Sequence, residues 1–306
     1  MAFSCIFVKI ILSLHTQIGS DMNKQYQELK VEEGVYIPQP ALDYPENNPF
    51  ERTLFPTFDR ELLIDENYPY LNDSPSNIRR MRWGYLFILK IGLNILLRVK
   101  MGLRIRGREI LKKYKKEFSH GAITIANHVF RLDCPCVLLA VNAKHTTRIP
   151  MFAPNFRTKD SFFLSLVGGV PIPDSSSNMT ALKKFNEAFD EFHRRGWWFH
   201  IFPEACRWDF YKPLRPFQKG AFTMSYKYNK PILPCVITFR ERKGIYRLFG
   251  AKEVPLLTVT IGEPIFPDTT QPRKTEVDRL REVAHNQMSK MAGITHNPWP
   301  AAWDNQ

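Results

Sequence analysis

From residue 121 onward, short apolar runs alternate with segments whose apolar residues recur every three or four positions. The runs predict buried strands, and the periodic segments predict helices packed against them. The clearest helix covers 181–193, where Leu182, Phe185, Phe189 and Phe192 are spaced by three and four. Strands are predicted at 122–126, 148–153, 197–202, 232–239 and 256–262, and further helices at 134–142, 161–167, 220–228 and 274–291. The alternation predicts an α/β sheet with helices on its faces.

The segment 78–118 has a different pattern, and we expect helices over 78–100 and 107–116. Lys90, Asn94 and Arg98 are spaced by four and share one helix face, which leaves a wide apolar face opposite. A charge at the bilayer centre costs about 2.5–3.5 kcal/mol, so we expect a helix lying in a membrane interface and not one that spans it. The alternative is a core-packing helix with one solvated stripe. We call 78–118 the basic amphipathic segment.

Charge is concentrated in the basic amphipathic segment. The chain has 43 Lys and Arg residues against 30 Asp and Glu, a net charge of +13. Between Ile78 and Lys116 there are 13 basic residues and one acid, Glu109. Such a balance indicates an anionic partner, either a membrane surface or a nucleic acid. Because the cations are mixed with many large aliphatic residues and no nucleic-acid motif is present, we expect an anionic membrane surface and no nucleic acid.

Residues 1–77 form an acidic, proline-rich N-terminal arm, and 119–306 the α/β domain. The arm carries seven prolines between 35 and 75 and no sustained period, so we expect it to be irregular and packed through Phe50, Phe55 and Phe58. Its apolar stretch 2–14 is too short to span a bilayer and lacks the features of a signal peptide; Met22 is a candidate start. Five cysteines without framework spacing indicate a reducing compartment, and they predict neither a disulfide scaffold nor a metal site.

Two polar clusters follow predicted strands directly. Asn127-His128-Val-Phe-Arg131-Leu-Asp133 follows the strand at 122–126, and Pro203-Glu204-Ala-Cys206-Arg207 follows the strand at 197–202. Ligands of open α/β sheets gather beyond the carboxyl ends of strands, so both clusters are candidate site residues.

His128 and Asp133 can meet only if the chain turns between them and Asp133 begins the next helix. The sequence Asp133-Cys-Pro135 is typical of a helix start and permits that turn. A carboxylate that holds one imidazole nitrogen leaves the other free to accept a proton from an alcohol. The alternative is that Asp133 only caps the helix and His128 is a loop residue.

The second cluster has three interpretations. Glu204 and Arg207 could form a salt bridge at the strand end, or Arg207 could bind a substrate phosphate through its planar guanidinium. Cys206 could also act as a nucleophile with His128 as its base, although the nearby carboxylate of Glu204 disfavours a thiolate.

The two clusters together resemble the hallmark motifs of the 1-acylglycerol-3-phosphate acyltransferase family. These motifs are Asn127-His128-x4-Asp133, an HxxxxD motif, and Phe202-Pro203-Glu204-x-x-Arg207. Three further blocks follow the family's order: Gly168-Gly169-Val170-Pro171-Ile172, Lys219-Gly220-Ala221 and Lys230-Pro231-Ile232-Leu233-Pro234-Cys235. The resemblance covers about 105–267, roughly half of the chain.

The resemblance implies an α/β acyltransferase domain preceded by membrane-associating helices, and hence a membrane-associated protein on the cytoplasmic face. It implies that His128 is the general base, that Asp133 orients it, and that no metal or redox cofactor is needed. The donor would be acyl-CoA or acyl-carrier protein, and the acceptor a lysophospholipid, by default 1-acylglycerol-3-phosphate. The residues expected at the substrate are Asn127, Arg131, Arg157, Glu204, Arg207, Lys219 and Gly220.

Three positions depart from the family pattern. Ala205 and Cys206 stand where a glycine and a hydroxyl residue are usual, and Asp174 lies in the region where an arginine often binds phosphate. Phosphate contacts would then come from Arg131, Arg157 or Lys159. These departures keep open an enzyme that reacylates another lysophospholipid in membrane remodelling. A non-catalytic peripheral lipid-binding protein is the alternative from another class.

Overall fold

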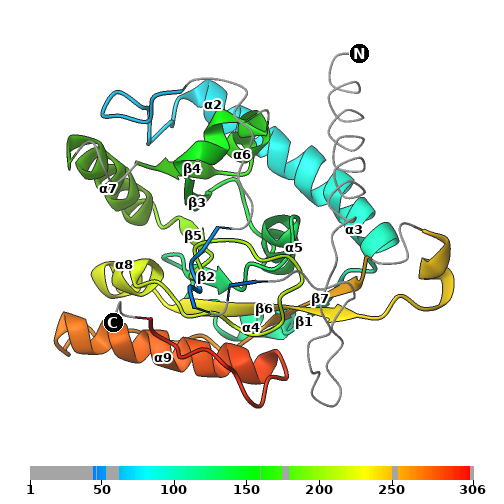
Figure 1. The fold of residues 1–306 in the computed structure, drawn as a ribbon. Coiled ribbons are helices and arrows are strands. Elements are labelled where there is room, and N and C mark those ends of the chain that lie inside the picture. The colour runs from blue at the N-terminus through cyan, green and yellow to red at the C-terminus, as the bar shows by residue number, and fades with distance from the viewer. Residues whose placement is uncertain are drawn as a thin grey trace.

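Seven strands form one mixed sheet in the computed structural model, in the order β1-β7-β6-β2-β5-β3-β4 (Figure 1). The structure describes residues 44–45, 47–52, 62–158, 160–173, 179–249 and 254–303. The strands are β1 (Arg104–Arg106), β2 (Ile123–Ala126), β3 (Thr147–Phe152), β4 (Gly169–Ile172), β5 (Trp198–Ile201), β6 (Ile232–Arg240) and β7 (Leu256–Ile261). Neighbouring strands are parallel except for β6 and β7, which are antiparallel.

Helices cover both faces of this sheet. They are α2 (Pro75–Trp83), α3 (Asn94–Met101), α4 (Arg108–Lys113), α5 (Asp133–Ala140), α6 (Ser161–Leu166), α7 (Met179–Arg194), α8 (Gly220–Tyr228) and α9 (Arg273–Met291), with a π-helix η1 (Gly84–Leu93) and 3₁₀ turns η2 (Ala153–Arg157) and η3 (Gly244–Leu248). The predicted α/β sheet with helices on both faces is thus confirmed. The edge strand β1 was not predicted, because Arg104-Ile105-Arg106 is too short for an alternating pattern to be recognised.

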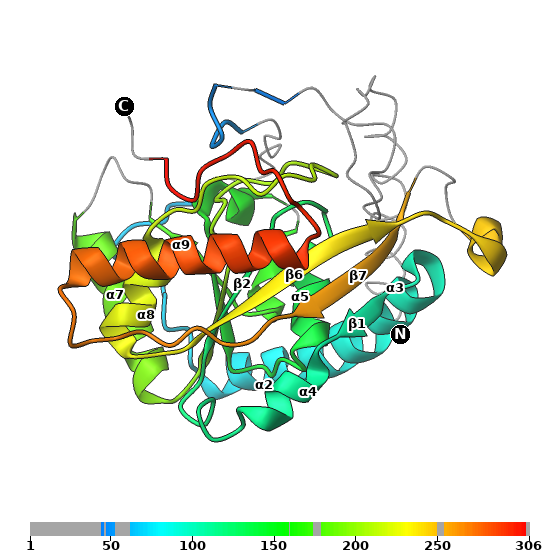
Figure 2. The same ribbon diagram turned by 90° about the horizontal axis from the view of Figure 1, so that it is seen from below.

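Alternation along β6 divides the core into two layers. Leu233, Cys235 and Ile237 face the layer formed with α5 and the helices of the basic amphipathic segment, whereas Ile232 and Val236 face the layer formed with α7, α8 and α9. Figure 2 shows α9 and α3 on the two sides of the sheet. This arrangement follows from the period of two in a strand, which sends successive side chains to opposite faces. On α7, Phe185, Phe189 and Phe192 are buried, while Leu182 is exposed.

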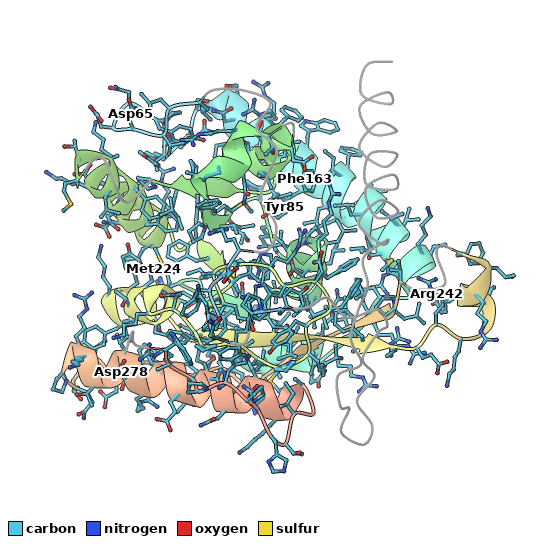
Figure 3. The ribbon with its side chains drawn as sticks, viewed as in Figure 1. Asp65, Tyr85, Phe163, Met224, Arg242 and Asp278 are labelled. Carbon is cyan, nitrogen blue, oxygen red and sulfur yellow. The ribbon has the colours of Figure 1, made fainter. Side chains whose placement is uncertain are left out.

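Helices α2, η1 and α3 run on without a break as one rod from Pro75 to Met101. One face of the rod is buried in the core through Tyr85, Leu89, Leu93 and Leu97, spaced by four. The hydroxyl of Tyr85, which Figure 3 labels, donates a hydrogen bond of 2.7 Å to the carbonyl of Val167 at the end of α6. In the part of the chain that the structure describes, no helix is long and apolar enough to cross a membrane.

The rod shows features of both alternatives left open by the sequence. Lys90, Asn94 and Arg98 do form a polar stripe, in which Lys90 binds Asn142 and Arg98 binds Asn94. Beside it lies a second apolar stripe that faces solvent. Its members share a spacing of four and side chains between 42% and 58% exposed: Trp83, Phe87, Ile91, Ile95 and Val99. The rod is therefore packed on one side and apolar on its outer side.

Parts of the N-terminal arm contact the body. Tyr44 stacks on Trp208 with ring centroids 4.6 Å apart, and Tyr70 meets Phe185 edge to face at 6.0 Å. Phe50 is half-buried. The expectations for 2–14, Met22, Phe55 and Phe58 lie outside the described residues, as do those for Lys159 and Asp174.

Candidate active site

The loop after β2 brings His128 against Asp133. The chain turns through Asp133 N–H···O=C Phe130 at 3.0 Å, and α5 begins at Asp133 itself. As a result, His128 Nδ1 lies 2.6 Å from Asp133 Oδ2. Asp133 was expected at the cap position and is instead the first helical residue, where the positive end of the helix dipole favours a carboxylate.

Hydrogen bonds to Asp133 determine which ring nitrogen of His128 carries the proton. Oδ2 accepts the backbone N–H groups of Val129 at 3.1 Å and Phe130 at 3.3 Å, and Oδ1 accepts that of Cys134 at 2.6 Å. Three N–H donors stabilise the ionised carboxylate. The network therefore assigns the proton to Nδ1 of His128, which leaves Nε2 as the proton acceptor. The imidazole is 24% exposed and stacks on Phe202 with ring centroids 4.1 Å apart.

Backbone hydrogen bonds join the two motif loops. Trp208 N–H donates to the carbonyl of His128 at 3.0 Å, and Phe210 N–H donates to that of Val129 at 2.8 Å. The two clusters that follow β2 and β5 in the sequence therefore form one rigid edge of the sheet, as their positions after neighbouring strands predicted.

Glu204 is buried beneath this edge of the sheet. Its Oε2 accepts the backbone N–H of His128 at 2.8 Å and lies 3.2 Å from Nη2 of Arg215, while Oε1 accepts the backbone N–H of Arg215 at 3.0 Å. These contacts make Glu204 a positioning residue for the main chain of His128, and its expected role at the substrate stays a prediction.

Arg215 takes the place at Glu204 that the sequence suggested for Arg207. Its guanidinium is 1% exposed, lies over the ring of Trp208 and donates to the carbonyls of Pro49 and Cys206. Arg207 instead forms an ion pair with Asp209 at 2.8 Å and is 24% exposed. Arg215 was missed because no motif marks it, and only the fold of the loop before α8 returns it to Glu204.

Cys206 is buried and fully engaged. Its thiol lies 3.5 Å from the carbonyl of Glu51 and 2.8 Å from Nη1 of Arg215. The base proposed for it, His128, is held by Asp133. A thiol enclosed in this way cannot receive an acyl group, which removes the rival cysteine mechanism.

The side chain of Asn127 is hydrogen-bonded to the sheet. Its side-chain amide donates to the carbonyl of Ile237 at 3.0 Å and accepts the backbone N–H of Ile237 at 2.8 Å, so that it extends the pairing of β2 and β6. A buried amide with both ends occupied holds the base of the His128 loop, which differs from the expected contact with substrate.

The remaining expected substrate residues come from different elements of the fold. Arg131 is half-buried, 3.6 Å from Asp160, and Arg157 donates to the carbonyl of Leu62 at 3.1 Å. Lys219 and Gly220 are exposed at the N-terminus of α8. They stay close to the second motif because the next residue back, Gln218, donates its N–H to the carbonyl of Pro203 at 2.8 Å.

A second histidine, His200, lies close to the pair formed by His128 and Asp133. His200 on β5 has no exposed surface, and its Nδ1 meets Thr124 Oγ1 at 2.9 Å. Because Thr124 donates its own proton to the carbonyl of Phe199, His200 Nδ1 must be the donor in this contact. Burial lowers the pKa of His200 to about 4, against an opposing attraction from Asp133. His200 is therefore a neutral residue, and its position in a strand gave no signal of this contact.

The part of the chain that contains this site is similar to known proteins. Residues 102–238, which include both motif loops, match the profile of the family described as Acyltransferase. Among solved structures, the chain is similar to 1-acyl-sn-glycerophosphate (LPA) acyltransferase, PlsC, from Thermotoga maritima, with 19% identity and a TM-score of 0.40 over 75% of this chain and 98% of that one. The sequence matches none of the curated proteins.

Proposed function

The chain belongs to the acyltransferase family, and from that premise we propose that it transfers a fatty acyl group from a thioester donor to the hydroxyl of a lysophospholipid. The observation that carries the proposal is the contact of 2.6 Å between His128 Nδ1 and Asp133 Oδ2, which leaves Nε2 as the base. The default acceptor is 1-acylglycerol-3-phosphate, and the donor is acyl-CoA or acyl-carrier protein.

The proposed reaction proceeds by direct attack. Nε2 of His128 accepts the proton of the acceptor hydroxyl as its oxygen forms a bond to the thioester carbonyl carbon. Asp133 stabilises the imidazolium. Collapse of the tetrahedral intermediate breaks the carbon–sulfur bond, and the imidazolium returns its proton to the departing thiolate. General-base assistance of this kind contributes about 10²–10⁴ in rate, and binding both substrates at the rigid edge supplies positioning.

Acyl transfer by purified protein tests the proposal. Labelled oleoyl-CoA and oleoyl-acyl-carrier protein are offered with a panel of lysophospholipids, using wild type, His128→Ala and a matched control, His120→Ala, whose side chain is exposed. We expect label in phosphatidate with wild type and the control, and none with His128→Ala. Label in another phospholipid would indicate the remodelling enzyme. Vesicle binding without transfer to any acceptor would contradict catalysis and favour the peripheral lipid-binding protein.

The outer stripe of the rod supports action at a membrane. Trp83, Phe87, Ile91, Ile95 and Val99 expose apolar surface beside Arg79, Arg80 and Arg82. Apolar side chains that enter the acyl boundary and cations that meet anionic headgroups are the features of an interfacial helix. We expect Phe87→Ser/Ile95→Ser to lose binding to vesicles containing anionic lipid. The matched control is Met179→Ser/Leu182→Ser on α7, and equal loss in both pairs would contradict an interfacial role of the rod.

A further inference from the structure

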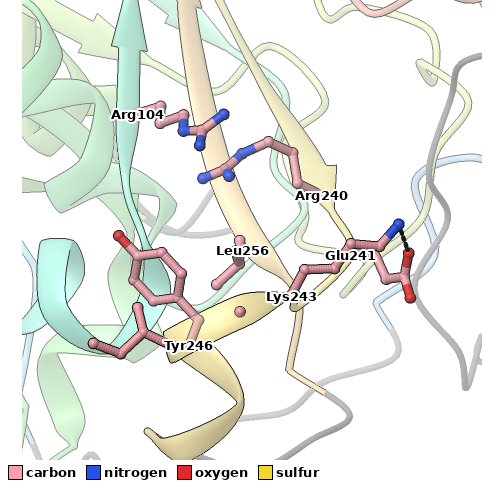
Figure 4. A pocket seen from close by; sticks show the side chains of 8 residues that line it. Arg104, Arg240, Glu241, Lys243, Tyr246 and Leu256 are labelled. Carbon is pink, nitrogen blue, oxygen red and sulfur yellow. Dashed lines mark ion pairs between the residues drawn. The ribbon is translucent and has the colours of Figure 1, made fainter.

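A cavity lies at the carboxyl end of β6, the strand that pairs with β2. It has a volume of about 540 Å³ and is lined by residues at the start of β1, the end of β6, the turn η3 and the start of β7 (Figure 4). Leu256 forms part of its floor and the ring of Tyr246 one wall. Tyr246 lies close to the backbone, because a Cβ on Gly102 would be 3.1 Å from its ring.

Two arginines converge in this cavity. Arg104 is the register partner of Thr258 on β7, and Arg240 donates from Nε to the hydroxyl of the same Thr258 at 2.9 Å. Figure 4 shows the two guanidinium groups side by side above the strand. Arg240 is held in this orientation by the carbonyls of Leu257, at 3.1 Å, and of Gly102. Its Nη1 has no hydrogen-bond partner in the described part of the chain.

The positive charge of this pair is not neutralised by the surrounding described residues. Neither Arg104 nor its neighbour Arg106 forms an ion pair with any residue the structure describes. The carboxylate that lines the cavity, Glu241, is bound to Lys243 at 2.6 Å. Burial lowers the pKa of Arg240, and the nearby charges of Arg104 and Arg106 lower it further. Two neighbouring guanidinium groups that repel each other are stabilised by an anion between them, and phosphate matches guanidinium geometry.

The cavity lies at the same edge of the sheet as His128, because β6 pairs in parallel with β2 and Arg240 is at the carboxyl end of β6. The side chain of Asn127, next to His128, is bound to Ile237 on β6, and Arg240 is three residues farther along the same strand. A rise of 3.3 Å per residue places Arg240 about 10 Å along β6 from Ile237. A donor with its thioester carbon at His128 extends its pantetheine arm away from the dyad, and its phosphates lie at the far end of that arm.

We propose that the cavity between Arg104, Arg240 and Tyr246 binds a phosphate group of the acyl donor, at the nucleotide end of an acyl-CoA. The two guanidinium groups bind the phosphate, and the ring of Tyr246 offers a face on which adenine can stack. This inference rests on the proposed function and selects CoA among its donors. An anionic lipid headgroup presents the same phosphate chemistry, and the experiment separates the two sources.

The test uses Arg104→Gln, since Arg104 is exposed and its loss leaves the hydrogen bonds of Arg240 in place. The control is Arg273→Gln, an exposed arginine at the start of α9. Acyl transfer is measured with oleoyl-CoA, oleoyl-dephospho-CoA and oleoyl-pantetheine. We expect Arg104→Gln to raise KM for oleoyl-CoA about tenfold, the loss of one charge-assisted hydrogen bond, with kcat unchanged. Its KM for oleoyl-pantetheine should equal that of wild type. An unchanged KM for oleoyl-CoA, or equal rises for all donors, would overturn the proposal.

Two further measurements separate the possible causes of failure. Flotation with vesicles of phosphatidylcholine and phosphatidylglycerol tests the headgroup: vesicle binding lost in Arg104→Gln with an unchanged KM for oleoyl-CoA would assign the phosphate to lipid and overturn the donor site. Calorimetric titration with free CoA requires no turnover. If wild type transfers no acyl group yet binds CoA tenfold more tightly than Arg104→Gln, the proposed function fails and the phosphate site stands.

Discussion

Oε2 of Glu204 accepts the backbone N–H of His128 at 2.8 Å, so the carboxylate of the second motif holds the main chain of the first. The same carboxylate is paired with Arg215, and both side chains are 1% exposed. The main chain of His128 is therefore held by a carboxylate that belongs to a buried ion pair.

Breaking this ion pair should destabilise the protein strongly. In Glu204→Gln the guanidinium of Arg215 remains buried without its counter-ion, which typically costs about 3–5 kcal/mol. We expect the free energy of unfolding, measured with urea, to fall by that amount. Glu263→Gln is the control, because its pair with Lys113 is more than half exposed and should change stability by about 0–1 kcal/mol. Similar losses in both variants would show that Glu204 does not support the site.

Asp133→Asn should change the orientation and protonation of His128 without unfolding the protein. The amide can still accept a hydrogen bond, but it can present an N–H to Nδ1 of His128, which then places the ring proton on Nε2. We expect kcat to fall about 10²- to 10⁴-fold while far-UV circular dichroism is unchanged. Asp160→Asn, whose side chain is 48% exposed, should retain wild-type kcat. A wild-type kcat in Asp133→Asn would contradict the assigned tautomer.

Ala205 has a backbone conformation that favours glycine. Its φ is +64° and the residue is exposed, at the position where the related motif usually has glycine. The left-handed conformation costs an L-residue about 1–2 kcal/mol. We expect Ala205→Gly to raise the free energy of unfolding by about 1 kcal/mol, after the extra chain entropy of glycine is subtracted.

The same exchange in a helix should have the opposite sign. Ala188 lies inside α7, and Ala188→Gly should lower the free energy of unfolding by about 1 kcal/mol. Urea denaturation of both variants checks the pair. A loss of stability in Ala205→Gly would refute the strain assigned to this turn.

His200 should make the protein sensitive to acid. Its pKa is about 4 in the folded protein and near 6.5 when unfolded, so the unfolded chain binds more protons between these values. Its contribution is complete above pH 6.5 and is lost as the pH falls toward 4, an effect on the order of 3 kcal/mol. We expect His200→Asn, which does not titrate, to lose less stability than wild type between pH 7 and pH 4. Parallel unfolding curves over that range would rule out a neutral His200.

Local pattern was sufficient to predict most of the fold. Strands such as β2 and helices such as α7 were predicted within one or two residues, because a buried strand is a short apolar run and a surface helix repeats its apolar residues every three or four positions. The contact between His128 and Asp133 could also be predicted from the sequence, since the turn and helix start that allow it lie within six residues of chain.

The sequence by itself thus determined the α/β class, the two motif loops at one edge of the sheet and the charge of the rod. Only the tertiary structure decided that Glu204 pairs with Arg215 and not with Arg207, that Asn127 serves the sheet, and that Arg104 and Arg240 share a cavity. The reason is physical. Hydrophobic period and turn chemistry act over a few residues, whereas a buried ion pair or a cavity depends on strand order and loop return, which bring together groups far apart in the chain.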